Sequence, residues 1–192
     1  MRRLTLLSLC LLLCGYGCGP HVATFARGEQ RISSGSLVVV LPFENLSGRE
    51  NASEKITEYF ILSLRRIDGL KVAEFGQTYE LLRRHRVRSA TFLTDAQVDS
   101  LAAGLGASYI IAGSVLEFTE TNNQYLGEIP EVSLNVRMIS CASRKTVWSG
   151  VVNSRGDQSE VLFGIGAVRS KEELARRAID ETVDRMAELI GK

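Results

Sequence analysis

Residues 132–138 alternate without a break between apolar and polar side chains. The apolar positions are Val132, Leu134, Val136 and Met138, and the polar ones are Ser133, Asn135 and Arg137. This period of two predicts a β-strand that packs on one face only, as strands of antiparallel sheets often do. A second strand-like run follows at 146–153, after the turn-forming sequence Ser143-Arg144-Lys145. The two runs therefore predict an antiparallel hairpin.

The elements around this hairpin follow from the same kind of pattern. Residues 37–41 are continuously apolar, which suits a strand covered on both faces. The other expected elements are a helix at 52–67, a strand at 70–75, helices at 77–87 and 94–105, a strand at 107–119, a polar loop at 120–131 and a helix after Ser170. This order predicts an α/β fold of the α+β type, with a mixed sheet, helices mainly on one face, an antiparallel meander and a C-terminal helix.

Several helix ends carry capping signals. Asn51 with Glu54, Thr94 with Gln97, and Ser170 with Glu173 have the spacing of capping boxes. Gly106 is expected to end the helix that Thr94 begins. Gly113, inside an otherwise apolar strand, predicts a bulge or a close approach of another group.

The N-terminus has the layout of a secretory signal. A basic start at Arg2 and Arg3 is followed by an apolar run from Leu4 to Cys14 and by small residues up to Cys18. The run is shorter than the ~18–20 residues that span a bilayer as a helix. The small residues before Cys18 resemble the lipobox of bacterial lipoproteins, which implies acylation of Cys18 and removal of residues 1–17. Ordinary secretion with cleavage after Ala26 and an uncut anchor are the alternatives.

Residues 18–36 are rich in Gly and Ser and predict a flexible tether from the lipid to a single domain at 37–192. Such a tether would reach roughly 20–25 Å. In lipoprotein sorting signals, Gly19 rather than Asp after the acylated Cys implies passage to the outer membrane.

Composition argues against several classes of protein. The chain has 23 basic and 22 acidic residues, and this balance gives no indication of a nucleic-acid partner. Three of the four cysteines lie in the signal or at its end, so Cys141 would remain alone, without an intramolecular disulfide. The only histidines are His21 and His85, and no catalytic, cofactor-binding or metal-binding motif is present, so we expect no enzyme, cofactor or metal site.

Three stretches together resemble a known group of envelope proteins. They are residues 37–48 (LVVVLPFENLSG), 104–118 (GLGASYIIAGSVLEF) and 132–150, which ends in Trp148-Ser149-Gly150. Their order resembles the periplasmic domain of the curli assembly/transport component family, of the lipoprotein activators of penicillin-binding proteins and of TolB-N-like domains. The resemblance implies a mixed α/β periplasmic domain over residues 37–190, without catalytic residues.

The curli family inserts two long hairpins into the outer membrane, and the chain departs from that pattern. Residues 120–131 are polar without alternation, and residues 154–169 are too few for two membrane-spanning strands of ~9–11 residues each. We therefore expect a protein that builds no pore.

Two clusters are candidate contact surfaces. The basic group contains Arg83, Arg84, Arg86 and Arg88. It suits either an anionic partner or a solvated helix end, which the helix dipole favours for cations. The apolar group contains Leu162, Phe163, Ile165 and Val168. It suits either closure of the core or an interface with a partner.

The resulting hypothesis is a non-enzymatic outer-membrane lipoprotein, facing the periplasm and acting through protein contacts in envelope assembly or secretion. Its expected partners are membrane lipid, through acylated Cys18, and an unidentified envelope protein, and self-association is left open. One alternative is an activator of a peptidoglycan synthase, against which the short tether argues. Another is a secreted module that binds a small ligand or a glycan.

Overall fold

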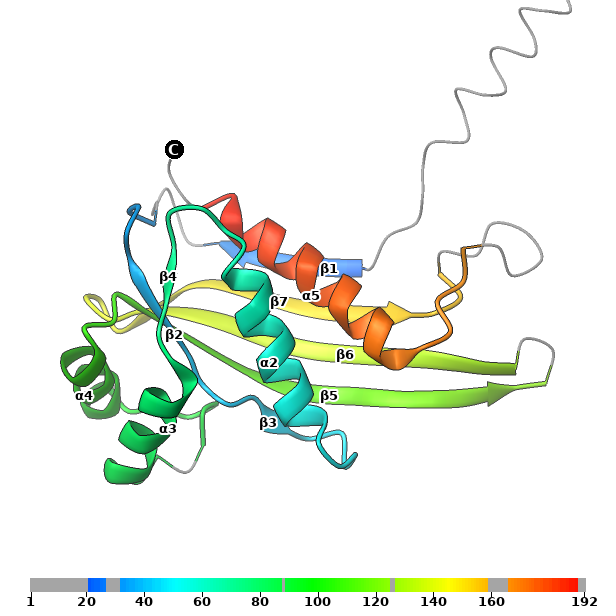
Figure 1. The fold of residues 1–192 in the computed structure, drawn as a ribbon, viewed down its shortest axis with the longest axis horizontal. Helices are drawn as coiled ribbons and strands as arrows, with labels where there is room; N and C mark the ends of the chain where they lie inside the picture. Colours follow the sequence, from blue (N-terminus) through cyan, green and yellow to red (C-terminus); the bar gives the residue numbers. More distant parts are fainter. Residues whose placement is uncertain (1–20, 27–31, 88, 125–126, 159–165, 190–192) are drawn as a thin grey trace, which may run out of the picture.

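The computed structural model describes residues 21–26, 32–87, 89–124, 127–158 and 166–189, and these form a mixed sheet with helices on both faces (Figure 1). The helices are α2 (Ala52–Leu64), α3 (Phe75–Arg84), α4 (Asp95–Leu105) and α5 (Lys171–Ala187). The strands are β1 (His21–Ala26), β2 (Leu37–Val40), β3 (Glu44–Asn45), β4 (Lys71–Val72), β5 (Tyr109–Asn123), β6 (Gly127–Ser140) and β7 (Lys145–Arg155). The predicted fold class and the order of its main elements are confirmed.

The sheet has seven strands in the order β1-β7-β6-β5-β2-β4, and β3 also pairs with β5. Each adjacent pair in the series β1, β7, β6 and β5 is antiparallel, which confirms the expected meander. Strand β2 is parallel to both β4 and β5. The parallel part corresponds to the first half of the chain, where helices separate the strands.

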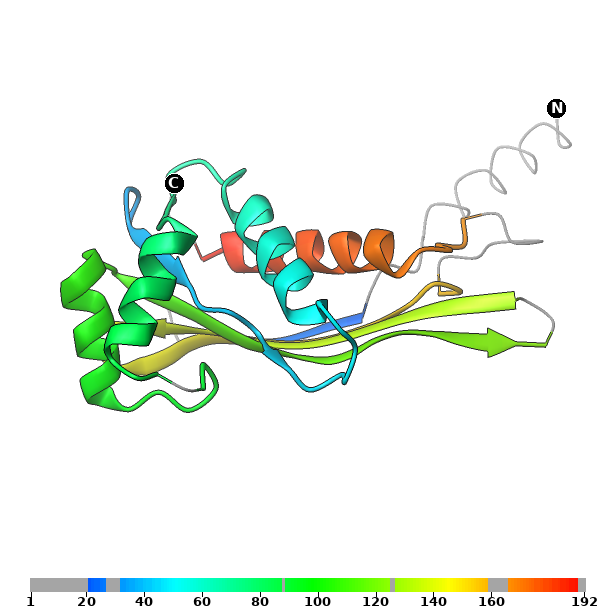
Figure 2. The same cartoon turned by 60° about the horizontal axis from the view of Figure 1, so that its bottom comes forward.

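The two longest helices, α2 and α5, cover one face of the sheet, over a core that contains Phe60, Trp148 and Ile179 (Figure 2). The shorter helices α3 and α4 lie at one end, where Leu82 and Leu101 belong to a second, smaller core. Strand β2 serves both cores, because Val38 and Val40 face the first and Val39 faces the second. This explains its continuous apolar sequence.

Two of the three predicted helix caps form. Thr94 and Gln97 make a complete capping box, and Ser170 Oγ accepts a hydrogen bond from the Glu173 N–H. Gly106 ends α4 in the left-handed conformation, with φ 70°. The predicted cap at Asn51 is wrong: this residue is itself left-handed, with φ 57°, and its side chain makes no capping hydrogen bond. A side chain caps best from an extended backbone, which Asn51 does not adopt.

Part of the predicted flexible tether is a strand. Residues 21–26 form β1, which pairs along its whole length with β7. Val22 packs against the core, and Phe25 is exposed. An edge strand held mainly by backbone hydrogen bonds needs little apolar sequence, which is why composition failed to indicate it.

The predicted polar loop at 120–131 is also wrong, because it forms the paired ends of β5 and β6. The register runs from Glu120 opposite Pro130 to Asn123 opposite Gly127. In Figure 1 these strand ends extend beyond the rest of the sheet. Most side chains here are exposed, so no alternation of burial is imposed on the sequence.

Candidate functional site

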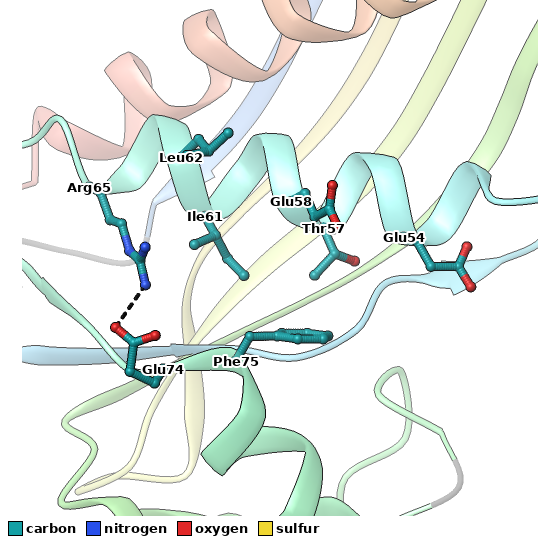
Figure 3. Close-up of a pocket in the computed structure, with 8 residues that line it drawn as sticks. All are labelled: Glu54, Thr57, Glu58, Ile61, Leu62, Arg65, Glu74 and Phe75. Atoms are coloured by element: carbon teal, nitrogen blue, oxygen red, sulfur yellow. Dashed lines mark hydrogen bonds and ion pairs between the residues drawn. The ribbon is translucent and has the colours of Figure 1, made fainter.

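A surface groove separates α2 from the start of α3 (Figure 3). Its volume is about 400 Å³, and it is lined by Glu54, Thr57, Glu58, Ile61, Leu62, Arg65, Glu74 and Phe75. The apolar part comes from Ile61, from Leu62, which is 59% exposed, and from Phe75, which is 39% exposed. Exposed apolar side chains that line a hollow are typical of contact surfaces.

Local structure explains why the groove exists. Helix α2 turns Ile56, Phe60 and Leu64 into the core, which leaves Leu62 outward. Helix α3 starts at Phe75 directly after β4, so that the Phe75 ring lies beside α2 (Figure 3). The groove was not predicted from the sequence, because the alternating pattern at 70–75 placed Phe75 in a strand. Leu62, an apolar residue outside the stripe of its helix, was the available signal.

The rim of the groove is acidic. Glu74 forms an ion pair with Arg65 at 3.0 Å between carboxylate and guanidinium. Glu54 and Glu58 have no ion-pair partner among the described residues. An apolar floor with unpaired carboxylates at its edge suits an apolar segment that carries basic side chains.

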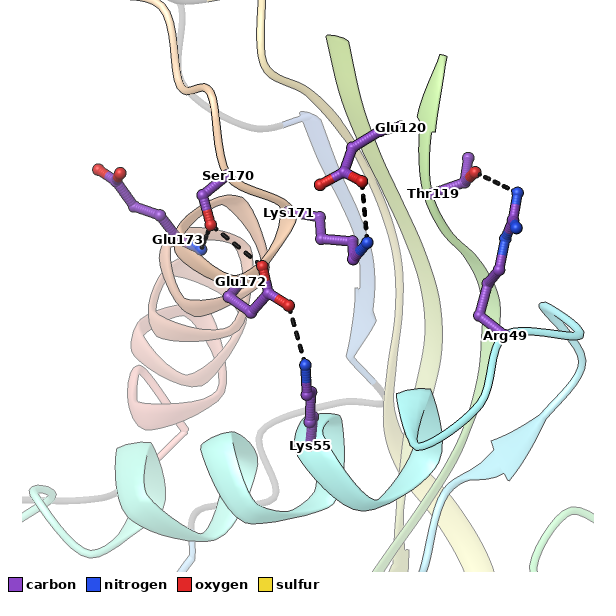
Figure 4. Close-up of polar contacts among 8 residues, drawn as sticks. All are labelled: Arg49, Lys55, Thr119, Glu120, Ser170, Lys171, Glu172 and Glu173. Carbon is purple, nitrogen blue, oxygen red and sulfur yellow. Dashed lines mark hydrogen bonds and ion pairs between the residues drawn. The ribbon is translucent and has the colours of Figure 1, made fainter. Parts of the chain in front are cut away.

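A second cluster of polar contacts stabilises the base of the β5–β6 hairpin (Figure 4). Lys55 of α2 pairs with Glu172 of α5 at 2.9 Å, and Lys171 pairs with Glu120 of β5 at 2.9 Å. The hydrogen bond between Lys55 and Glu172 raises the pKa of the lysine and lowers the pKa of the glutamate. The two helices are thereby linked to each other and to the hairpin.

Both lysines of this cluster also lie over one aromatic ring. The Nζ atoms of Lys55 and Lys171 are 5.9 and 5.7 Å from the centre of the Phe118 ring. Phe118 is buried, so the ring joins the cluster to the core. Such ammonium–ring contacts are favourable in addition to the ion pairs. We interpret the cluster as a structural support.

The predicted basic cluster only partly falls within the described structure. Arg83 and Arg84, at the end of α3, pair with Glu80 of the same helix at 3.2 and 3.6 Å. Arg86 is exposed in a left-handed conformation, with φ 51°, and Arg88 lies outside the described residues. The local ion pairs fit a solvated helix end, and an anionic partner stays a prediction.

Of the predicted apolar contact residues and Cys18, likewise, only some lie within the described structure. Val168 is 3% exposed within the main core, and its N–H donates to the Gly156 carbonyl, so it is not part of an exposed contact loop. Leu162, Phe163 and Ile165 lie outside the described residues, and so does Cys18. Trp148 and Cys141 are buried, as expected of packing residues.

Within the described ranges, no three or more His, Cys, Asp or Glu side chains are grouped in a way that could hold a metal ion. Over the same residues, no helix combines the length and the apolar character that crossing a membrane requires.

No family model matches the sequence, and no curated protein is a detectable relative. The fold is similar to PelC from Paraburkholderia phytofirmans, solved as a dodecamer, with TM-score 0.56 and 15% identity over 90% of this chain and 99% of PelC. It is similar to lipoprotein GNA1162 from Neisseria meningitidis, with TM-score 0.55 and 18% identity over 80% of this chain and 99% of that one. The solution structure of LpoB from E. coli matches with TM-score 0.50 and 16% identity, over 65% of this chain and 59% of LpoB. At these identities the likeness concerns the fold alone.

Proposed function

We propose that this chain is a non-enzymatic lipoprotein of the outer membrane, anchored through Cys18, whose domain faces the periplasm and binds another envelope protein. The observation that carries the proposal is the groove between α2 and α3, which Leu62 and Phe75 line together with Glu54 and Glu58, two carboxylates without an ion-pair partner in the described part of the chain. The signal-like N-terminus and the fold shared with lipoprotein GNA1162 support the anchored location.

The occupant that the groove fits is an apolar segment flanked by Lys or Arg. Its apolar side chains would cover Ile61, Leu62 and Phe75, and its cations would face Glu54 and Glu58. Charge at the rim of an interface mainly sets partner choice and the rate of encounter, while apolar contacts at the centre supply affinity. The charged rim and the apolar centre of the groove can therefore be tested with separate variants.

The anchor is tested by mass spectrometry and membrane fractionation of wild type and Cys18→Ala. An acylated Cys18 at the mature N-terminus, in the outer-membrane fraction, is the expected result for wild type. An unmodified N-terminus in the soluble fraction would reject the lipoprotein assignment and leave a secreted binding module as the better hypothesis.

Protein binding is tested by photo-crosslinking in cells from position 62, with position 46 as the matched control. Leu46 is 62% exposed but lies outside the groove. We expect one defined adduct from position 62 that disappears when Glu54 and Glu58 are both changed to Lys, and no adduct from position 46. An adduct from position 62 that persists when Glu54 and Glu58 are changed to Lys would contradict the proposed recognition of basic side chains.

Self-association is a second candidate, favoured by the similarity to a protein solved as a dodecamer. In that case the adduct from position 62 would contain two copies of this chain, and the purified acylated protein would sediment as an oligomer.

Activation of a peptidoglycan synthase, suggested by the resemblance to the activators of penicillin-binding proteins, is less well supported. Only Gly19 and Pro20 separate Cys18 from β1. An anchor this short keeps the domain at the outer membrane, away from a synthase in the inner membrane.

A further inference from the structure

The sheet begins very close to the proposed lipid anchor. Strand β1 starts at His21, three residues after Cys18. Because an extended chain spans at most about 3.6 Å per residue, the Cα atom of Cys18 lies within about 11 Å of the Cα atom of His21. The lipid therefore places the β1 edge of the sheet at the membrane surface.

One face of the sheet next to this edge is uncovered. Helix α5 packs over β7 and β6 on the other face, where Trp148 and Val152 belong to the core. Among the described residues, Figure 2 shows no helix on the opposite face of β1 and β7, whereas β6 is covered on that face at Ile139 by α4 and at Arg137 by the loop at 89–91. Helices α3 and α4 lie at the far end, by β2 and the start of β5.

The register identifies the residues of this uncovered face. Directly paired residues of neighbouring strands project to the same side of a sheet. Phe25 pairs with Ser149 and Ala23 pairs with Val151, while Val151 in turn pairs with Asn135 of β6. Val22 pairs with the core residue Val152 and so lies on the opposite side.

Beside the β1 edge, this face combines exposed apolar side chains with uncharged polar ones, and charged side chains follow on β6 and β5. Phe25 is 61% exposed, Val151 is 42% exposed, and Leu116, at the bulge of β5, is 38% exposed. Ser149, Asn135 and Asn153 lie next to Phe25 and Val151, whereas Arg137, which pairs with Ser149, and Glu117, which pairs with Ser133, lie farther from β1. An aromatic ring beside uncharged polar groups, close to a lipid anchor, suits the headgroup layer of a bilayer.

We propose that the uncovered face of β1 and β7, around Phe25 and Val151, is the surface that lies on the phospholipid bilayer. The proposal rests on acylation of Cys18, because a few exposed apolar side chains do not hold a protein on a membrane alone. In this orientation the helical face, including the groove at Leu62 and Phe75, points away from the lipid and is open to a periplasmic partner. The anchor thus supplies attachment, and the sheet face supplies orientation.

The test uses the acylated protein reconstituted in vesicles of phosphatidylethanolamine and phosphatidylglycerol. Single cysteines at Val151, Arg177 and Asn122, in a Cys141→Ser background, carry an environment-sensitive fluorophore, and brominated lipids serve as the quencher. Arg177 reports the helical face, and Asn122 reports the exposed end of the hairpin. We expect quenching at position 151, and none at position 177.

A variant pair separates the sheet face from general membrane binding. Phe25→Ser should abolish most of the quenching at position 151 while the acylated protein still pellets with the vesicles. Phe92→Ser, which removes an even more exposed ring elsewhere, should leave the quenching unchanged.

The alternative outcomes are distinct. Quenching at position 122 without quenching at 151 would mean that the protein stands on its hairpin, and would overturn the proposal. Protection of position 151 that depends on protein concentration and not on brominated lipid would assign the face to a second copy, and would also overturn it. If the purified protein carries no acyl group, the proposed anchor fails, and the membrane orientation fails with it. If the acyl group is present and position 151 is not quenched, only the orientation fails.

Discussion

Glu44 on β3 and Arg137 on β6 hold the same short loop, residues 89–91, the first by accepting from its hydrogen-bond donors and the second by donating to its carbonyl oxygens. The Glu44 carboxylate accepts hydrogen bonds from the Ser89 hydroxyl and, at 2.5 Å, from the Thr91 hydroxyl. The Arg137 guanidinium donates to the carbonyl oxygens of Ala90 and Thr91. The connection between α3 and α4 is thereby fixed to the sheet by a pair of opposite charges that are both partly buried.

The pKa of Glu44 is lowered by this arrangement. Burial alone would raise the pKa, but hydrogen bonds from Ser89 and Thr91 and the charge of Arg137 bring it below its ordinary value of 4.5. Because the pKa in the folded protein lies below that of the unfolded chain, the stabilisation is fully present above pH 4.5. It is lost as the pH falls through the folded-state value.

We therefore expect Glu44→Gln to destabilise the protein by about 1–2 kcal/mol at neutral pH, since hydrogen bonds to a charged group are lost. The difference from wild type should shrink below pH 4.5. Urea unfolding at neutral pH and below pH 4.5 measures this difference in the free energy of unfolding. Glu50→Gln is the control, because Glu50 is exposed and lies outside this cluster. A difference that stays constant with pH would show that the charge of Glu44 does not matter.

The Phe43 ring packs so closely against Gly113 of β5 that no side chain fits at this position. A Cβ atom at this position would lie 2.4 Å from Phe43 Cε1 and 2.6 Å from the Asn135 carbonyl oxygen. Gly113→Ala should therefore destabilise the fold by about 1–3 kcal/mol, the usual cost of overpacking. Gly76→Ala is the matched control, because Gly76 has open space around its Cα and should be neutral or slightly stabilised. Equal unfolding midpoints in urea for the two variants would contradict this account.

The sequence predicted the main elements where side-chain periodicity records burial. The alternation at 132–138 placed β6, and the Thr94–Gln97 pair placed the start of α4. Gly113 was correctly expected to allow a close approach. In these cases a physical requirement acts on the side chain itself, so a single sequence reveals it.

The features that the sequence did not predict depend on the backbone or on tertiary position. Strand β1 and the exposed ends of β5 and β6 are held by main-chain pairing, which any non-proline residue can supply. Asn51 has the composition of a cap but the wrong backbone conformation. The groove requires α2 and the start of α3 to lie side by side, with Ile61 facing Phe75, and no local sequence pattern predicts such a tertiary arrangement.

Cys141 should be a slow-reacting thiol. Burial, with a smaller contribution from the charge of Asp99, raises its pKa from 9.0 to about 11. Since thiolate is the reactive form, the shift alone lowers its fraction at neutral pH by about a hundredfold, and limited access slows reaction further. The measurement is the rate of modification by a thiol reagent in a variant whose other three cysteines are serine. Ser143→Cys in the matching Cys141→Ser chain gives the exposed reference, and similar rates at the two positions would refute the burial of Cys141.

Phe118 should be among the most sensitive positions of the fold, because its buried ring joins the core to the ammonium groups of Lys55 and Lys171. Phe118→Ala is expected to cost about 3–5 kcal/mol, as for other buried aromatic residues. Phe92→Ala, at a ring 79% exposed, should change the stability by less than about 0.5 kcal/mol.

Phe118→Leu separates the two roles of the ring, since leucine keeps apolar volume but offers no aromatic face to the lysines. Its loss of stability should lie between those of the two alanine variants, and it should become smaller when Lys55 and Lys171 are both changed to Met. The comparison is a double-mutant cycle measured by urea unfolding. A cost for Phe118→Leu that is the same with and without the lysines would mean that the ring contributes by packing alone, and that the ion pairs with Glu172 and Glu120 support the hairpin independently of it.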